Sequence, residues 1–402
     1  MDQHFSYRDL TAAMNGRGAA LRSLTILQPI EGEGGKLFPA TYAGAKYAME
    51  KRRIHDGADT EQTVDCVLLD SVQSQANRAE IALYDEIERG TIILPLIKVD
   101  FSASNPKFRK DVEPVTSLHA PHRLADAILR DSVLDDGTRF SRSKYAESWR
   151  RANPSNATPV YELCPTALVF GMWGSPEKPG GLGAKFERAF VSEIVAVDIL
   201  KNDKRQGFRI DPLSASSKVM VVPNADGGFQ ISEGKSKGAL KPSEINHGNV
   251  PFDNENAGVR CRYAEQMTVI SLGALRKLRF PLDGKSDTKR DDAGRTVLAA
   301  IALCAGILAT ERGVSLRSRC NLIPTAPRVW ELLDAPGETP RKFALTGAEA
   351  VALLTEAIGG AQAAGLTWID APIELKPSPE LISLIRESQD RMAASGEESE
   401  AS

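Results

Sequence analysis

Short apolar runs typical of strands alternate irregularly with helical periods along this chain, and long polar stretches separate them. We expect strands at 24–27, 67–69, 91–101, 218–222, 267–271 and 314–322, and helices at 71–89, 121–134 and 291–311. Because a doubly wound parallel sheet needs regular strand–helix repeats, this order favours an α+β fold. The clearest element is the helix 71–89, where apolar residues recur at helical spacing and Gly90 provides a stop signal.

Charge is distributed unevenly along the 402 residues. Residues 331–402 hold 13 Asp and Glu against 5 Lys and Arg, a balance of −8. The whole chain holds 50 Lys and Arg against 53 Asp and Glu, so residues 1–330 hold 45 against 40, a balance of +5. A mildly basic body permits a polyanionic partner but does not require one.

After residue 335 the sequence becomes acidic and carries clear helix-start signals. Thr346 and Glu349 form a capping box for one helix, and Ser378-Pro379 begins another. We therefore divide the chain into a body, 1–335, and an acidic helical extension, 336–402. The final EESEAS has the composition of a disordered end.

Cysteine spacing and hydropathy predict a soluble cytoplasmic protein. The five cysteines include no C-x-x-C pair, so neither a zinc site nor a disulfide framework is indicated. The longest apolar run, 297–309, has 13 residues and is too short to cross a bilayer. The first residues lack the apolar core of a secretory signal. We expect no metal, no cofactor and no membrane contact.

A Pro/Gly-rich loop at 173–183 is the first candidate binding element. A strand-like run at 166–172 enters it, and the chain leaves through Lys185 and Arg188, which would share a helical face. Three glycines in the loop would let the backbone approach a bulky ligand: Gly180, Gly181 and Gly183. The loop matches neither the Walker A nor the dinucleotide pattern. It predicts a phosphate-facing loop, or alternatively a flexible strand–helix connection.

Polar side chains crowd the start of the expected helix 71–89. Four of them lie within six residues: Gln73, Gln75, Asn77 and Arg78. Amide and guanidinium groups near a helix N-terminus suit phosphates, sugar hydroxyls and base edges. The alternative is an exposed helix face that binds nothing.

Two further segments offer polar donors. Lys241, Asn246 and His247 lie in a stretch without apolar periodicity, which predicts either a ligand-contacting loop or a self-satisfied turn network. Arg317 and Arg319 are two residues apart, which predicts that they share one face of a strand. Two guanidinium groups on one face would point to solvent or to an anion.

Histidines suggest two weak metal sites. His119 and His122 could act with Asp126, and His55-Asp56 resembles a phosphohydrolase dyad. However, metal ligands normally come in threes or fours, and Gly57 suits a turn better than the helix such a dyad needs. The sequence also lacks a G-x-S-x-G elbow. Donors and cations spread over many segments fit a long polymeric anion better than a compact catalytic centre.

Seven segments, taken together, resemble a known family. In chain order they are GGKLFPATY (34–42), LLDSVQSQANRAE (68–80), TSLHAPHRLADAILRDS (116–132), ELCPTALVFGMWG (162–174), GGLGAKFERAFVSEI (180–194), KPSEINHGN (241–249) and LRSRC (316–320). Their combination closely resembles the RAMP-superfamily backbone subunit of type I-G (formerly I-U) CRISPR Cascade complexes.

The resemblance implies a palm with an RRM-like (ferredoxin-like) core. It implies finger-like insertions at about 36–60 and 102–160 and a thumb-like insertion at 201–262. It also implies several copies arranged head to tail along a CRISPR RNA, whose guide bases pair with target DNA. Other Cascade subunits and a recruited helicase–nuclease would be partners, and this subunit would bind RNA without cutting.

On this reading we expect RNA contacts from residues that match the family segments. They are Gln73, Gln75, Asn77, Arg78, His122, Arg123, Gly180, Gly181, Gly183, Lys185, Arg188, Lys241, Asn246, His247, Arg317 and Arg319. The alternative hypothesis is a metal-dependent RNase or phosphohydrolase. Related type III backbones cut RNA with a thumb aspartate, and Asp211, Asp226 and Asp253 lie in the thumb-like segment.

Overall fold

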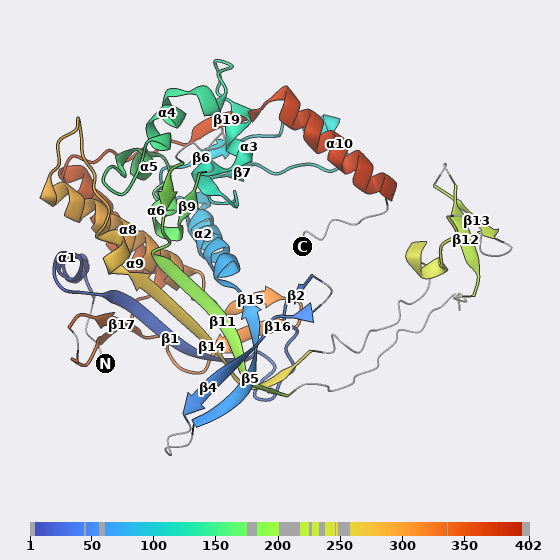
Figure 1. The fold of residues 1–402 in the computed structure, drawn as a ribbon, viewed down its shortest axis with the longest axis horizontal. Coiled ribbons are helices and arrows are strands. Elements are labelled where there is room, and N and C mark those ends of the chain that lie inside the picture. The colour runs from blue at the N-terminus through green and yellow to red at the C-terminus, as the bar shows by residue number, and fades with distance from the viewer. Residues whose placement is uncertain are drawn as a thin grey trace.

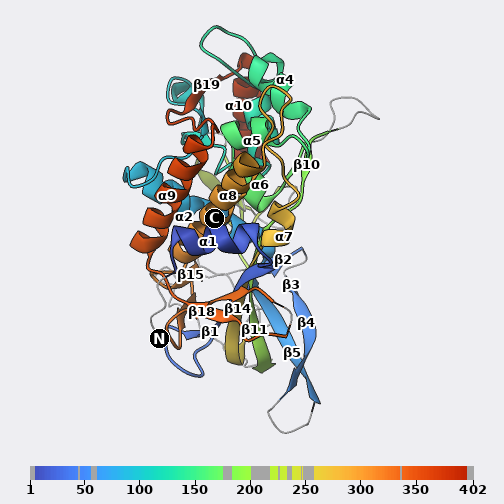
Figure 2. The ribbon, with the colours of Figure 1, turned by 90° about the vertical axis from the view of Figure 1, so that its left-hand side faces the viewer.

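A large curled antiparallel sheet lies beneath a layer of helices in the computed structural model of the chain (Figures 1 and 2). The residues described are 5–43, 46–55, 61–174, 183–200, 218–224, 227–232, 238–245, 247, 258–335 and 337–395. Helices and strands are mixed along the chain, and the fold is α+β, as the sequence predicts.

Seven strands of the large sheet follow one another in space in an order unlike their order in the chain. This order is β15 (Val314–Arg317), β16 (Cys320–Pro324), β1 (Ala20–Pro29), β14 (Arg260–Ser271), β11 (Phe190–Leu200), β5 (Glu61–Asp70) and β4 (Met49–His55). All these neighbours are antiparallel. β17 (Trp330–Leu333) pairs with β1 and with β18 (Arg341–Phe343), which makes nine strands among the described residues.

The helices cover one face of this sheet, with α8 (Thr288–Leu308) at the centre (Figure 2). Nearly every residue of α8 from Gly294 to Ile307 is buried, because α1 (Tyr7–Asn15), α2 (Val72–Glu88) and α9 (Gly347–Ala363) all pack against it. Gly294 lets the ring of Phe280 pack closely on α8, since a Cβ there would lie 2.7 Å from that ring. The opposite sheet face leaves Leu24 more than half exposed.

The C-terminal region is integrated into the body. Its strand β19 (Ile373–Pro377) lies between β6 (Ile97–Val99), to which it is parallel, and β8 (Ser132–Val133). β7 (Val115–Thr116) completes this four-stranded sheet. The Thr346–Glu349 capping box is present at the start of α9, and α10 (Pro379–Ser395) begins at the expected Pro379. The end expected to be disordered, 397–402, lies outside the described residues.

The remaining elements are short. They are β2 (Thr41–Tyr42), β3 (Lys46–Tyr47), α3 (Ala127–Arg130), α4 (Lys144–Arg150), α5 (Thr158–Leu163), α6 (Thr166–Phe170), β9 (Met172–Trp173), β10 (Lys185–Phe186), β12 (Met220–Pro223), β13 (Phe229–Ser232) and α7 (Leu272–Leu275), with 3₁₀ turns at Asn105–Lys107, Arg123–Ala125, Phe140–Arg142 and Pro242–Ile245.

The expected strand at 166–172 is wrong, because Thr166–Phe170 forms the helix α6. Every residue of α6 is buried, and a continuous apolar run of this length is compatible with a strand or with a fully buried helix. The helical exit from the Gly-rich loop is also wrong. Lys185 belongs to the strand β10, and Arg188 lies in the short link to β11.

The expected elements at 91–101 and 121–134 are shorter than predicted. Only Ile97–Val99 forms a strand in the first segment. In the second, a 3₁₀ turn precedes α3, because the Asp126 carboxylate caps a new helix by accepting from Ile128 N at 2.9 Å.

The expected strand at 314–322 is a hairpin of β15 and β16. Arg319 lies in its turn with φ of 60°, so Arg317 and Arg319 do not share a strand face. The Arg319 guanidinium instead stacks on the ring of Phe38, 4.0 Å from its centroid.

Candidate nucleic-acid interface

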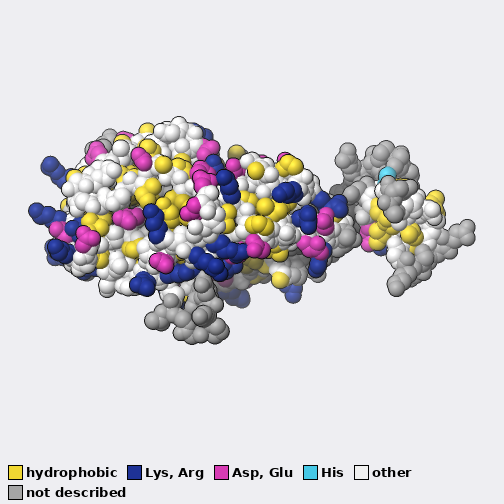
Figure 3. Space-filling view, turned by 90° about the horizontal axis from the view of Figure 1, so that it is seen from above, with side chains coloured by type: hydrophobic (Ala, Val, Ile, Leu, Met, Phe, Trp, Pro, Cys, Tyr) yellow, Lys and Arg dark blue, Asp and Glu magenta, His cyan; other side chains and the backbone are white. Residues whose placement is uncertain are grey.

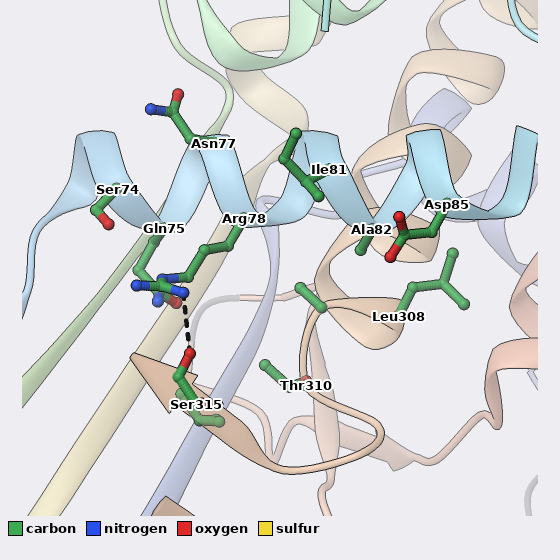
Figure 4. Close-up of a pocket in the computed structure, with 12 residues that line it drawn as sticks. Ser74, Gln75, Asn77, Arg78, Ile81, Ala82, Asp85, Leu308, Thr310 and Ser315 are labelled. Carbon is green, nitrogen blue, oxygen red and sulfur yellow. Dashed lines mark hydrogen bonds between the residues drawn. The ribbon is translucent and has the colours of Figure 1, made fainter. Parts of the chain in front are cut away.

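The polar side chains at the start of α2 point in two directions. Ser71 caps the helix by accepting from Ser74 N at 3.3 Å, and this fixes the rotation of the first turns. Gln73 and Asn77, four residues apart, are exposed, whereas Gln75 is buried against the sheet. Figure 4 shows Gln75 and Arg78 pointing toward β15 while the Asn77 amide points away from it.

The Gln75 amide belongs to a buried polar layer between α2 and the sheet. Its Nε2 donates to Asp70 Oδ2 at 2.6 Å, and its Oε1 accepts from Ser192 Oγ at 3.0 Å and from Gln266 Nε2 at 2.7 Å. Arg328 Nη2 donates to Gln266 Oε1 at 2.8 Å, and burial lowers the pKa of Arg328 to about 10. Gln75 therefore joins the helix to the sheet from the inside.

Arg78 and Arg317 both approach the buried carboxylate of Asp70. Arg78 Nε donates to Asp70 Oδ2 at 3.0 Å, and its terminal nitrogens donate to the carbonyls of Ser315 and Leu316 at 3.0 and 2.9 Å. Arg317 Nη1 donates to Leu69 O at 3.0 Å, and its Nη2 lies 3.8 Å from Asp70 Oδ1. Both guanidinium groups are about one-third exposed. Two cations over one carboxylate leave a net positive charge that solvent or an anion can reach.

An open groove of about 460 Å³ runs beside this cluster, between α2 and the segment from α8 to β15 (Figure 4). Its walls include Ser74, Arg78 and Asp85 from α2, and Thr310 and Ser315 on the other side. Hydroxyl, guanidinium and carboxylate groups thus alternate with the apolar side chains of Ile81 and Leu308. Such a lining suits a ligand with both polar and flat apolar parts.

The second candidate region is the base of the Gly-rich loop. β9 and β10 pair in the register Trp173 with Lys185 and Met172 with Phe186. The Lys185 ammonium lies 5.3 Å from the centroid of the exposed Trp173 ring. Gly183 is exposed, whereas Gly180 and Gly181 lie outside the described residues.

Arg188 and Arg123 lie behind this pair, close to a buried carboxylate. Arg123 donates to both oxygens of Glu80, at 2.6 and 2.7 Å, and to Gly171 O at 3.0 Å. Burial raises the pKa of Glu80, although the guanidinium of Arg123 opposes this shift. Arg188 donates to Phe170 O at 3.2 Å and is half-buried. Arg123 therefore holds α2 against the loop base and is not presented to solvent.

The other predicted residues are dispersed. His122 is exposed beside Arg123, while His119 accepts from or donates to Thr116 at 2.8 Å, and burial lowers its pKa. Lys241 directly follows Leu240, which bridges to Val221 of β12, and the His247 ring contacts that of Phe229 in β13. Figure 1 shows the β12–β13 hairpin away from α2. Asn246 lies outside the described residues.

No group of three or more His, Cys, Asp or Glu side chains is arranged to hold a metal ion within the described ranges. Asp126 serves as a helix cap, and Asp56 and the three thumb aspartates (Asp211, Asp226 and Asp253) lie outside those ranges. Of the helices described, none combines the length and the apolar character needed to cross a membrane.

Sequence reasoning missed two participants. The Pro/Gly loop pattern alone indicates no role for Trp173, although an aromatic residue next to an apolar one in an alternating strand predicts an outward ring. Asp70 was not singled out, because its role depends on arginines 8 and 247 residues further along the chain.

A family model matches a segment that makes up less than half of the chain. Residues 21–201, from β1 to β11, match the model of a family described as CRISPR-associated protein GSU0053. The matched segment is therefore similar to a CRISPR-associated family, and it contains both α2 and the β9–β10 pair. No curated protein matched the chain.

Proposed function

Starting from the CRISPR-associated family of residues 21–201, we propose that this chain acts in CRISPR defence as the RNA-binding backbone subunit of a type I-G Cascade complex. The observation that carries the proposal is the family match over the segment that presents Gln73, Asn77 and Lys185 to solvent. The chain would bind CRISPR RNA and would not cut it.

The topology supports an RRM-like palm. Four strands lie in the order β16-β1-β14-β11, with α2 between β1 and β11 in the chain and α8 between β14 and β16. This β-α-β-β-α-β arrangement, with its last strand beside its first, is that of ferredoxin-like and RRM domains. The β4–β5 hairpin extends the sheet beyond β11.

The separation of the candidate contacts supports a long ligand. Lys and Arg side chains are scattered among Asp and Glu over the face in Figure 3, with no single basic patch. The candidate contacts likewise fall into separate groups: Gln73 and Asn77, the Arg78–Arg317 pair, and Lys185 with Arg188. An extended RNA backbone can reach such separated donors, because each contacts a different phosphate or 2′-hydroxyl.

The proposed assembly is the one that the family resemblance implies. Copies would bind head to tail along the guide, as an interface that does not close generates an open row. The finger-like segments and the thumb-like segment 201–262 would contact neighbouring copies, other Cascade subunits or target DNA paired with the guide. Cleavage would belong to a helicase–nuclease that the complex recruits.

The test is to purify the chain from its native-like host and to sequence the nucleic acid that accompanies it. We expect RNA of defined length bound to several copies of the chain, with binding that weakens steeply as salt rises. A solitary protein without RNA, whose affinity for single-stranded RNA is the same at low and moderate salt, would contradict the proposal. Metal-dependent RNA cleavage would favour the enzyme alternative.

A further inference from the structure

Trp173 is the most exposed aromatic ring among the large apolar side chains of the described residues, with 70% of its surface accessible. Exposed single apolar residues are common, so exposure alone assigns no role. What distinguishes Trp173 is how its backbone is held and which side chain lies beside it.

The backbone around Trp173 is fixed on both sides. Met172 and Phe186 form a cross-strand pair, and each is only 5% exposed. Gly174 N donates to Ala184 O at 2.8 Å, and a Cβ at Gly174 would lie 3.0 Å from the ring of Trp149. Because alternate residues of a strand point to opposite faces, these anchors turn Trp173 and Lys185 outward together.

A cation lies beside the ring. The Lys185 ammonium is 5.3 Å from the ring centroid and is exposed like the ring itself. A protein-binding hot spot is normally an aromatic residue inside a larger apolar patch. A pre-positioned ring beside a cation is instead an arrangement by which proteins stack an unpaired base and contact its phosphate.

We propose that Trp173 stacks on an unpaired base of the bound single-stranded RNA while Lys185 contacts the adjacent phosphate. This inference rests on the proposed RNA-binding function and adds to it a site that reads the presence of a base without reading its identity. Stacking is tolerant of sequence because every base has a flat face.

The experiment compares the full-length wild type with W173A and W173F, using a fluorescein-labelled single-stranded RNA of mixed sequence and the same strand with abasic positions. We expect W173A to bind intact RNA about 5- to 100-fold more weakly and W173F to stay within about 3-fold of wild type. The slope of log K against log salt should not change in W173A, because no charge is removed. On abasic RNA the three proteins should bind alike.

Tryptophan fluorescence gives a second readout. Trp149 and Trp330 are buried, and Trp368 is half-buried with Nε1 donating to Ile93 O at 2.9 Å. We therefore expect RNA to quench the wild-type emission and to leave that of W173F nearly unchanged.

Each remaining outcome overturns the inference. Wild-type affinity in W173A would refute stacking and leave RNA binding intact, as would a defect that persists equally on abasic RNA. If W173A loses self-association while its affinity for RNA is unchanged, Trp173 is a protein contact. If the wild type itself binds no RNA, the proposed function fails and the stacking site fails with it.

Discussion

The two candidate regions hold their cations in opposite ways. At the start of α2, Arg78 is tied inward to Asp70 and to the carbonyls of β15. At the β9–β10 pair, Lys185 lies over an exposed ring at the surface. A cation engaged by a buried carboxylate stabilises the fold first, whereas a cation on a rigid exposed strand is available to a ligand. Arg78 and Arg123 each bind a buried carboxylate, whereas Lys185 lies at the surface, so the buried partner makes the difference.

The strongest challenge to this comparison is Asp70→Ala. It would leave Arg78 and Arg317 without their shared carboxylate and Gln75 without an acceptor. We expect the free energy of unfolding to fall by about 3–5 kcal/mol, as measured by urea titration. Asp85→Ala, at an exposed carboxylate on the same helix, should change it by less than about 0.5 kcal/mol. If both variants change the unfolding free energy equally, the contacts of Asp70 with Arg78, Arg317 and Gln75 contribute little to stability.

Glu80→Gln tests the buried ion pair between Arg123 and Glu80 near the β9–β10 pair. Removing the carboxylate that pairs with buried Arg123 should cost about 2 kcal/mol of unfolding free energy near neutral pH. Because burial raises the pKa of Glu80 above its unfolded value, the native state binds more protons, and wild-type stability should fall as pH rises from about 4.5 to 7. This slope should be smaller in Glu80→Gln. Urea titrations across that pH range measure the slope of unfolding free energy against pH. Identical slopes in the wild type and in Glu80→Gln would rule out Glu80 as the source of the pH dependence.

The double variant Lys185→Gln/Arg188→Gln tests the exposed Lys185 together with the half-buried Arg188. We expect RNA binding to weaken by about tenfold and the slope of log K against log salt to decrease by about 1 to 2, because phosphate contacts are lost. Lys289→Gln, at an exposed cation of α8, is the matched control. Filter binding at several salt concentrations, together with a urea titration of each protein, separates loss of contact from loss of fold. An unchanged slope would remove this pair from the interface.

The smallest effect is expected from Gln73→Ala/Asn77→Ala. These exposed amides of α2 would contact sugar or phosphate without carrying charge, so affinity for RNA should fall by about 2- to 10-fold at an unchanged salt slope. Gln362→Ala, at an exposed amide of α9, is the control. If the double variant binds RNA as tightly as the control, Gln73 and Asn77 do not contact RNA. Arg78, with Arg317 beside it, is then the remaining candidate contact from α2.

Elements with clear periodicity could be predicted from the sequence. The helix expected at 71–89 is α2, that expected at 291–311 is α8, and their stops Gly90 and Gly313 have positive φ. The run 166–170 was misassigned, since an apolar segment buried on all sides has no periodicity to distinguish helix from strand.

The directions of individual side chains could not be predicted. Gln75 and Asn77 are two residues apart on one helix, yet one is buried and the other is exposed. Arg123 is held by Glu80, 43 residues away, and no local pattern reveals that pair. Polar density in the sequence located the candidate regions, but only long-range packing decides which donors remain available.

The position of β19 has a consequence for how the chain is made. This strand, contributed by residues 373–377, separates β6 from β8, although those two strands precede it by more than 230 residues. During synthesis both edges must therefore wait, unpaired, until almost the entire polypeptide has left the ribosome. A truncated chain that ends before Ile373 lacks β19. The facing edges of β6 and β8 then stay unpaired and open to aggregation.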